Sequence, residues 1–248
     1  MEASKPANSV VKALRVLHAV ARADGPHRLG DIAERSGVSK ASTHRVLATL
    51  VEEGYAAADG EGRYGCGNQL RAMAAQVLAD DAVGIDAVLR ALQQRLGQAV
   101  HLAVPSGDHA TYTHKVDPGH AYRIATDVGA PLPLHATAAG KALLAHLPAE
   151  EAAAVLDRTG LPARTPHTHT DRAGLVEELA AIRDAGYATD YEEADASICS
   201  IAAPVLDADG TPVGAVSVSS LTFLVTEEQL AGFAPAVRQA AEDVSRRL

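Results

Sequence analysis

Apolar residues recur at helical spacing through the first quarter of the chain. An amphipathic run covers residues 10–20, and residues 29–54 hold two more such runs. Gly37 should end the first of these two helices, and Ser39 is a suitable N-cap for the second. The core-facing stripe of the second helix comprises Val46, Leu47, Leu50 and Val51. This pattern predicts a helix-turn-helix over residues 29–54.

The opposite face of the predicted second helix carries small and hydrogen-bonding side chains around one long cation, Arg45. A helix needs a face of this kind to enter a DNA major groove. An ordinary helical hairpin with a solvated outer face is the alternative. The residues predicted to contact DNA are Ser39, Lys40, Ala41, Ser42, His44, Arg45 and Thr49.

A turn-rich hairpin follows the predicted helix-turn-helix. It covers residues 55–65, with Asp59-Gly60 as its turn and Arg63 near its tip. Arg63 is expected to contact a phosphate or the minor groove, although a solvated arginine is the alternative. A helix, a helix-turn-helix and a hairpin together make a winged helix.

Beyond residue 68 the pattern predicts a linker helix and then a mixed α+β domain. Helices are expected over residues 68–79, 82–97, 138–147, 150–157 and 171–185. Short apolar runs predict strands over residues 99–104, 110–116, 121–126, 200–206 and 213–219. Thr226 opens a capping box for a C-terminal helix, which Pro235 should kink or interrupt. This order favours a mainly antiparallel sheet flanked by helices.

Net charge differs between the two parts of the chain. The whole chain carries −9, but residues 1–68 hold nine Lys or Arg and eight Asp or Glu, and residues 69–248 hold 13 and 23. The acidic part repels a polyanion, whereas the front part tolerates or attracts one. A weakly basic DNA-binding domain makes few phosphate contacts, so useful affinity requires at least a dimer.

Composition argues against several classes of protein. Cys66 and Cys199 are not at metal-ligand spacing, so we expect neither a disulfide scaffold nor a metal site. No apolar run approaches the ~20 residues of a membrane span, and the N-terminus lacks a secretory apolar stretch. We therefore expect a cytoplasmic protein without a cofactor or membrane contact.

The sharpest feature of the second domain is the segment 131–145, PLPLHATAAGKALLA. Thr137 can cap a helix there, leaving the amides of Ala138, Ala139 and Gly140 free of bulky side chains. Such a helix N-terminus favours an anion. Tight helix–sheet packing, which also selects small residues, is the alternative.

Other segments add polar groups to the second domain. Asp190 follows a predicted helix, and Ser217 and Ser219 share one face of a predicted buried strand. A buried hydroxyl without a partner costs about 1–3 kcal/mol, so these serines need a ligand, a water or a neighbouring strand.

Three segments, in order along the chain, carry a family resemblance. They are S-x-x-K-A-L-R-V-L with the helix-turn-helix and E-E-G-Y, then P-L-H-A-T-A-A-G-K-A-L-L-A, then G-Y-A-T-D-Y-E-E…S-I-A-A-P-V. Over roughly residues 9–248 the chain resembles IclR-type bacterial transcriptional regulators. The resemblance implies a winged helix, a linker helix and a GAF-like domain. It also implies dimers or tetramers on palindromic operators, with small organic acids or aromatics as effectors.

The resemblance implies particular effector contacts. They are the amides of Ala138 and Ala139 and the side chains of Asp190, Ser200, Ser217 and Ser219. Ser200 stands where many members have Cys, and Ser197 where Gly is usual. Because a hydroxyl bonds better than a thiol, a relative's effector does not transfer directly. We expect a carboxylate at residues 138–140, with Asp190 disfavouring a second anion and preferring a hydroxyl donor.

The chain is accordingly predicted to comprise four parts. These are a disordered N-terminus over residues 1–8, a DNA-binding domain over 9–67, a linker helix over 68–80 and an effector-binding domain over 81–248. The leading hypothesis is a ligand-responsive transcription regulator that binds double-stranded DNA as a homodimer or tetramer. A sensor acting through a protein partner is the alternative. An enzyme using His135 or Asp190 is disfavoured, because the sequence has no nucleophile elbow, metal cluster or cofactor fingerprint.

Overall fold

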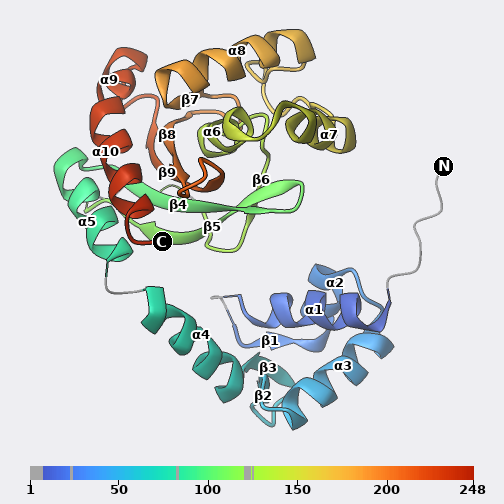
Figure 1. The fold of residues 1–248 in the computed structure, drawn as a ribbon. Coiled ribbons are helices and arrows are strands. Elements are labelled where there is room, and N and C mark those ends of the chain that lie inside the picture. Colours follow the sequence, from blue (N-terminus) through green and yellow to red (C-terminus); the bar gives the residue numbers. More distant parts are fainter. Residues whose placement is uncertain (1–7, 23–24, 82–83, 120–123, 125) are drawn as a thin grey trace. The chain divides into compact units, whose positions relative to one another are not determined.

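The computed structural model describes residues 8–22, 25–81, 84–119, 124 and 126–248 (Figure 1). Contacts divide the chain into two compact units, Met1–Ala82 and Val83–Leu248. Each unit has a hydrophobic core of its own. The division agrees with the change of pattern and charge along the sequence.

The first unit is a winged helix. Its elements are α1 (Ser9–Val20), β1 (His27–Arg28), α2 (Leu29–Ser36), α3 (Lys40–Glu52), β2 (Ala56–Ala58), β3 (Arg63–Cys66) and α4 (Asn68–Asp81). Asn8 caps α1, and Gly37 ends α2 with a φ of 63°, a conformation that favours glycine. Val16, Ile32 and Leu47 bring one residue from each of α1, α2 and α3 into the core. The strands form an antiparallel sheet in the order β1-β3-β2. The predicted helix-turn-helix and hairpin are therefore confirmed.

The second unit is an α+β domain. Its helices are α5 (Ile85–Leu96), α6 (Ala138–His146), α7 (Ala149–Thr159), α8 (Arg172–Ala185), α9 (Glu227–Gly232) and α10 (Ala234–Ser245). Its strands are β4 (Ala99–Ser106), β5 (His109–Val116), β6 (Pro131–Leu132), β7 (Ala188–Tyr191), β8 (Ile198–Leu206) and β9 (Pro212–Leu221). Within the described residues they form one antiparallel sheet in the order β6-β5-β4-β9-β8-β7.

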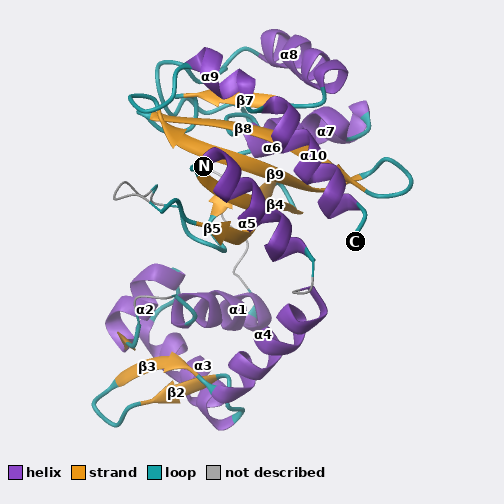
Figure 2. Cartoon of the chain, turned by 90° about the vertical axis from the view of Figure 1, so that its left-hand side faces the viewer, coloured by secondary structure: helices purple, strands orange, loops and turns teal. Residues whose placement is uncertain are grey.

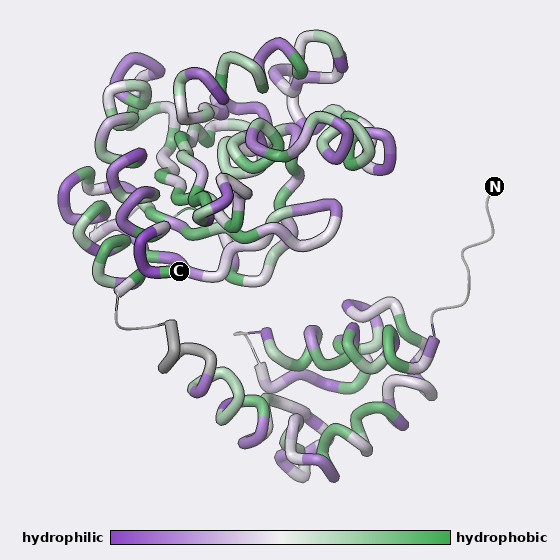
Figure 3. The backbone as a smooth tube through the Cα atoms, viewed as in Figure 1, coloured by the Kyte–Doolittle hydropathy of each residue, from purple (hydrophilic) through white to green (hydrophobic). Residues whose placement is uncertain are grey.

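Helices cover both faces of this sheet. One face, with Val100, Ile201 and Val218, packs against α5, α9 and α10. The other face, with Ala202 and Ala215, packs against α6, α7 and α8. Figure 2 shows α5 and α10 running side by side over the sheet. The central strands are mostly apolar in Figure 3, whereas the outer helices alternate apolar and hydrophilic residues, as a three-layer domain requires.

Most predicted elements of the second unit agree with the structure. The capping box at Thr226 opens α9, and Pro235 lies in the first turn of α10, so the C-terminal helix is interrupted as predicted. The strand predicted over residues 121–126 falls largely on residues 120–123 and 125, which lie outside the described residues. β6 and β7 were not predicted, because both are short and β7 includes the polar residue Asp190. No helix among the described residues is long and apolar enough to cross a bilayer.

Candidate nucleic-acid and effector sites

The outer face of α3 is open to solvent within its unit. Six of the seven predicted contact residues are exposed, and Ser42 is half-buried. Thr43 and Leu47 point inward, and the Thr43 hydroxyl donates to Val38 O at 3.2 Å. The side chains of Lys40, His44 and Arg45 form no hydrogen bond or ion pair with the described residues. These groups are free to meet a polyanion.

The start of α3 differs from the predicted cap in one respect. Ser39 occupies the N-cap position, but its side chain makes no capping hydrogen bond. Its hydroxyl donates instead to Ser42 Oγ at 3.1 Å. The hydroxyls of exposed Ser39 and half-buried Ser42 therefore form a pair at the helix N-terminus, where anions are favoured.

The wing has a longer loop than predicted. Asp59 Oδ1 accepts from the amides of Glu61 and Arg63 at 2.8 and 3.1 Å, which closes a loop over residues 59–62. These two hydrogen bonds hold the pKa of Asp59 below its usual value. Arg63 is consequently the first residue of β3, half-buried and opposite Arg28. Arg63 therefore stands at the loop end of β3, next to the tip, and the loop comprises residues 59–62 rather than Asp59-Gly60 alone.

The predicted anion site at the start of α6 has two available amides rather than three. Thr137 is the N-cap, and its Oγ1 accepts from the Gly140 amide at 3.1 Å. A Cβ on Gly140 would lie 2.5 Å from Leu134 Cα, so glycine is needed there for close packing. Gly140 is thus a packing and capping residue, whereas Ala138 and Ala139, both buried, keep their amides at the helix N-terminus.

The polar residues predicted for the effector site meet on the α6 side of the sheet. Ser200 of β8 lies between Asp190 of β7 and Ser219 of β9 in the strand register. The Ser200 hydroxyl donates to Asp190 Oδ2 at 3.3 Å. Ser217 lies two residues before Ser219 and therefore on the same face. Segments distant in the sequence thus place four polar side chains beneath α6.

Asp190 is the most perturbed carboxyl of this group. It is 2% exposed. Burial raises the pKa of Asp190 to about 7, helped by the nearby Glu193 charge, while hydrogen bonds from the Glu193 and Ala194 amides act the other way. Near neutral pH this carboxyl exists in both forms, so it can accept or donate a hydrogen bond.

His101 and Tyr112 belong to the same face but were not predicted. Their rings stack with centroids 4.3 Å apart. Burial and the Lys115 charge lower the pKa of His101 to about 4, and His101 Nε2 lies 2.9 Å from Thr126 Oγ1. Burial raises the pKa of Tyr112, while the hydroxyls of Ser217 and Ser219 act in the opposite direction. The sequence signal that could have identified them is the presence of polar residues at alternate positions of buried strands.

Lys141 was also missed as a site residue. It is fully buried in α6, and its Nζ donates to Glu178 Oε1 at 2.5 Å and to Glu193 Oε1 at 2.7 Å. His169, Glu178 and Glu193 place ligand-type atoms within 4.8 Å of one another. Because Lys141 already supplies the positive charge between the two carboxylates, this cluster is a buried ion-pair network.

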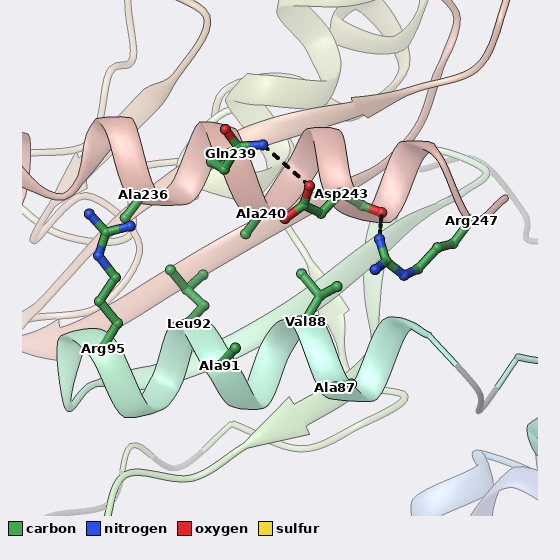
Figure 4. Close-up of a pocket in the computed structure, with 10 residues that line it drawn as sticks. All are labelled: Ala87, Val88, Ala91, Leu92, Arg95, Ala236, Gln239, Ala240, Asp243 and Arg247. Carbon is green, nitrogen blue, oxygen red and sulfur yellow. Dashed lines mark hydrogen bonds between the residues drawn. The ribbon is translucent and has the colours of Figure 1, made fainter.

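A groove of about 350 Å³ lies between α5 and α10, on the far side of the sheet from these polar residues. Figure 4 shows Val88 and Leu92 of α5 facing α10. The Arg247 guanidinium donates to Asp243 O at its rim. The groove therefore belongs to helix–helix packing and shares no residue with the effector site.

The two units together define a class of protein, in which a winged helix is joined to an α+β domain with a cluster of buried polar residues on its sheet. Comparison with known proteins identifies the family. Residues 9–60 match the IclR helix-turn-helix domain, and residues 82–246 match the bacterial transcriptional regulator IclR C-terminal domain. The chain belongs to the IclR family of bacterial transcriptional regulators, which confirms the resemblance and the function class derived from the sequence.

Individual relatives span the whole chain. The HTH-type transcriptional regulator XynR of Escherichia coli (strain K12) is 33% identical over 243 residues, covering 97% of this chain and 96% of XynR. A transcriptional regulator from Alicyclobacillus acidocaldarius superposes with a TM-score of 0.84 at 29% identity, covering 98% of this chain and 99% of that one. The inducer-binding domain of the Acinetobacter transcription factor PobR, a double mutant in complex with 3-hydroxybenzoic acid, has a TM-score of 0.60 at 28% identity. It covers 64% of this chain and 94% of that one.

Proposed function

We propose that α3 enters the major groove of an operator and that Arg45 contacts base edges. The supporting observation is the exposed outer face of α3, where the side chains of Lys40, His44 and Arg45 make no hydrogen bond or ion pair with the described residues. Ser39, Ala41, Ser42 and Thr49 supply the small and hydrogen-bonding surroundings that allow close approach. Arg63, at the loop end of the wing, contacts the flanking phosphates.

The second unit binds a small carboxylate. The carboxylate group of this ligand accepts hydrogen bonds from the amides of Ala138 and Ala139 at the positive end of α6. Asp190, Ser200, Ser217 and Ser219 line the opposite side, on the sheet. The convergence of these polar groups beneath α6 is the observation that carries this assignment. Because PobR was solved with 3-hydroxybenzoic acid, that acid is a reasonable first probe.

The protein acts as a homodimer or tetramer on a palindromic operator. Two observations favour association. The DNA-binding unit is weakly basic, so a single copy makes few phosphate contacts. In addition, Val10 and Leu14 of α1 are 62% and 53% exposed, an apolar edge that a second copy would cover. The proposed parts are residues 9–67 for DNA binding, 68–80 as the linker and 81–248 for the effector, in the cytoplasm where the operator lies.

The effector changes operator affinity by favouring one arrangement of the two DNA-binding units. A coupling of about 1–3 kcal/mol corresponds to a change of roughly 5–150-fold. The test is a gel shift with the full chain and the DNA upstream of its own gene. It is run with and without an acid that has been found to raise the melting temperature of the protein. Sequence-specific binding with an acid-dependent shift supports the function. Absence of binding at low salt contradicts it and favours a sensor acting on a protein partner.

A further inference from the structure

Two buried polar atoms on the α6 side of the sheet have no hydrogen-bond partner among the described residues. They are His101 Nδ1, on a side chain 0% exposed, and Ser217 Oγ, on a side chain 1% exposed. His101 and Ser217 are direct cross-strand neighbours on β4 and β9. The Tyr112 phenol is a close polar neighbour of Ser217, and the Ser217 hydroxyl lowers its pKa, but the two groups do not meet in hydrogen-bond geometry. Native proteins rarely bury such atoms without a partner.

Both side chains face the effector site rather than the opposite core. Side chains alternate between the faces of a strand, and Ala103 and Ala215, two residues from His101 and Ser217, pack with α6. The start of α6, with the amides of Ala138 and Ala139, belongs to that same layer. His101 and Ser217 therefore line one side of the proposed site, and the N-terminus of α6 lines the other.

The chemistry of the pair selects a neutral group. His101 is uncharged at neutral pH, because burial lowers its pKa to about 4. A neutral imidazole offers one donor and one acceptor nitrogen, and a serine hydroxyl both donates and accepts. Side by side, they can donate one hydrogen bond to a group and accept one from it. A hydroxyl fits this arrangement, whereas a second carboxylate offers no proton and meets Asp190 on the same face.

We propose that His101 Nδ1 and Ser217 Oγ bind a hydroxyl of the effector, so that the effector is a hydroxy acid. This inference rests on the proposed carboxylate site at the start of α6. The carboxylate is held at the helix N-terminus and the hydroxyl on the sheet between β4 and β9. His101 and Ser217 then determine specificity among acids of similar size, because a site built for a hydroxyl rejects an analogue that leaves its polar atoms unpaired.

The experiment compares matched acids on the full chain. Calorimetric titration and thermal shift are measured for glycolate against acetate, lactate against propionate, and 3-hydroxybenzoate against benzoate, which covers short and long spacings. At least one hydroxy acid is expected to bind about tenfold or more tightly than its partner. In Ser217→Ala that preference should fall to about twofold or less, mainly through weaker binding of the hydroxy acid.

Ser220→Ala is the matched control. Ser220 Oγ is also buried and without a hydrogen-bond partner among the described residues, but Ser220 lies on the opposite face, beside Cys199. Either substitution removes a buried hydroxyl without a partner and leaves an alanine in the same strand. Both variants should therefore fold, with melting temperatures equal to or higher than that of the natural chain. Ser220→Ala should keep the full preference for the hydroxy acid.

Each other outcome has a definite meaning. Equal affinity for hydroxy acids and for the matching acids without a hydroxyl is consistent with the carboxylate site but contradicts the proposal that His101 and Ser217 bind a hydroxyl. A preference that survives Ser217→Ala does the same, because an ordered water then satisfies the pair. If no acid of any pair binds, both this inference and the proposed effector class fail.

Discussion

Lys141 Nζ lies 2.7 Å from Glu193 Oε1, and this buried ion pair joins the first turn of α6 to the segment that follows β7. Asp190 stands three residues before Glu193, and its Oδ1 accepts from the Glu193 amide at 2.7 Å. The two sides of the proposed effector site are thus held together by one lysine. A ligand that contacts both sides meets a preorganised site.

Replacing Lys141 should destabilise the second unit strongly. Lys141→Met leaves the buried carboxylate of Glu193 and the half-buried carboxylate of Glu178 without their cation, and breaking a buried pair costs roughly 3–5 kcal/mol. Urea unfolding, followed by near-ultraviolet circular dichroism of the tyrosines, most of which lie in the second unit, measures the loss. The control is Arg158→Ala, which removes an exposed ion pair with Asp108 and should leave the midpoint nearly unchanged. Equal losses in the two variants would show that burial of the lysine is unimportant.

The protonation of Asp190 should control acid binding near neutral pH. Because the pKa of Asp190 is raised to about 7, the folded protein increasingly carries a neutral Asp190 as pH falls through 7. A bound carboxylate then meets less repulsion. The affinity for 3-hydroxybenzoate should therefore rise between pH 8 and 6. In Asp190→Asn the dependence should flatten, and an unchanged slope would refute the role of this carboxyl.

The raised pKa of Asp190 also makes the stability of the folded protein depend on pH. The direction of this dependence is opposite to that of an ordinary ion-paired aspartate. Its folded pKa of about 7 lies above the value of 3.8 usual for Asp. Between these two pH values the folded state therefore binds more protons than the unfolded state. The contribution of Asp190 to the free energy of unfolding is fully present below pH 4 and is lost as pH rises through 7. The difference in melting temperature between Asp190→Asn and the natural chain should accordingly grow in favour of the variant from pH 4 to 8.

Arg45→Ala should weaken binding to the native operator by roughly 1–3 kcal/mol while changing binding to random DNA far less. A guanidinium that contacts base edges contributes to discrimination, whereas a phosphate contact contributes equally on every sequence. Competition gel shifts at fixed salt measure both affinities. Lys40→Ala, at the first residue of α3, serves as the comparison, since a phosphate contact should lower both affinities alike. If Arg45→Ala also lowers both alike, Arg45 does not read bases.

The sequence predicted the helices well because their signals are local. Gly186 ends α8 with a φ of 74°, and Thr226 opens α9 through a capping box, so both boundaries depend on residues within one turn. The length of the wing loop was not predicted, for a related reason. Asp59 bonds two amides beyond the expected turn, and no residue pattern at Asp59-Gly60 distinguishes that loop from a two-residue turn.

The site could be predicted only in part, because its contacts join distant segments. Asp190 and Ser219 were selected from the residue pattern and Ser200 through the family resemblance, but their pairing follows from strand register that periodicity does not give. Lys141 and Glu193 are separated by 52 positions in the chain, and no local pattern links them. Gly140 shows the reverse case, in which a residue suited to an anion site donates its amide to Thr137 instead.

Ser197 occupies a backbone conformation that favours glycine, with a φ of 65°. Its amide donates to Glu192 Oε1 at 2.9 Å, a hydrogen bond that does not use the serine side chain. The left-handed conformation costs a non-glycine residue about 1–2 kcal/mol, and glycine loses roughly 0.5–1 kcal/mol through greater unfolded-state entropy. Ser197→Gly should therefore stabilise the protein by about 0.5–1 kcal/mol in urea unfolding. Gly210→Ser is the reverse substitution at a φ of 80° with open space around it, and it should destabilise. Destabilisation by Ser197→Gly would mean that the hydroxyl makes a compensating contact in solution.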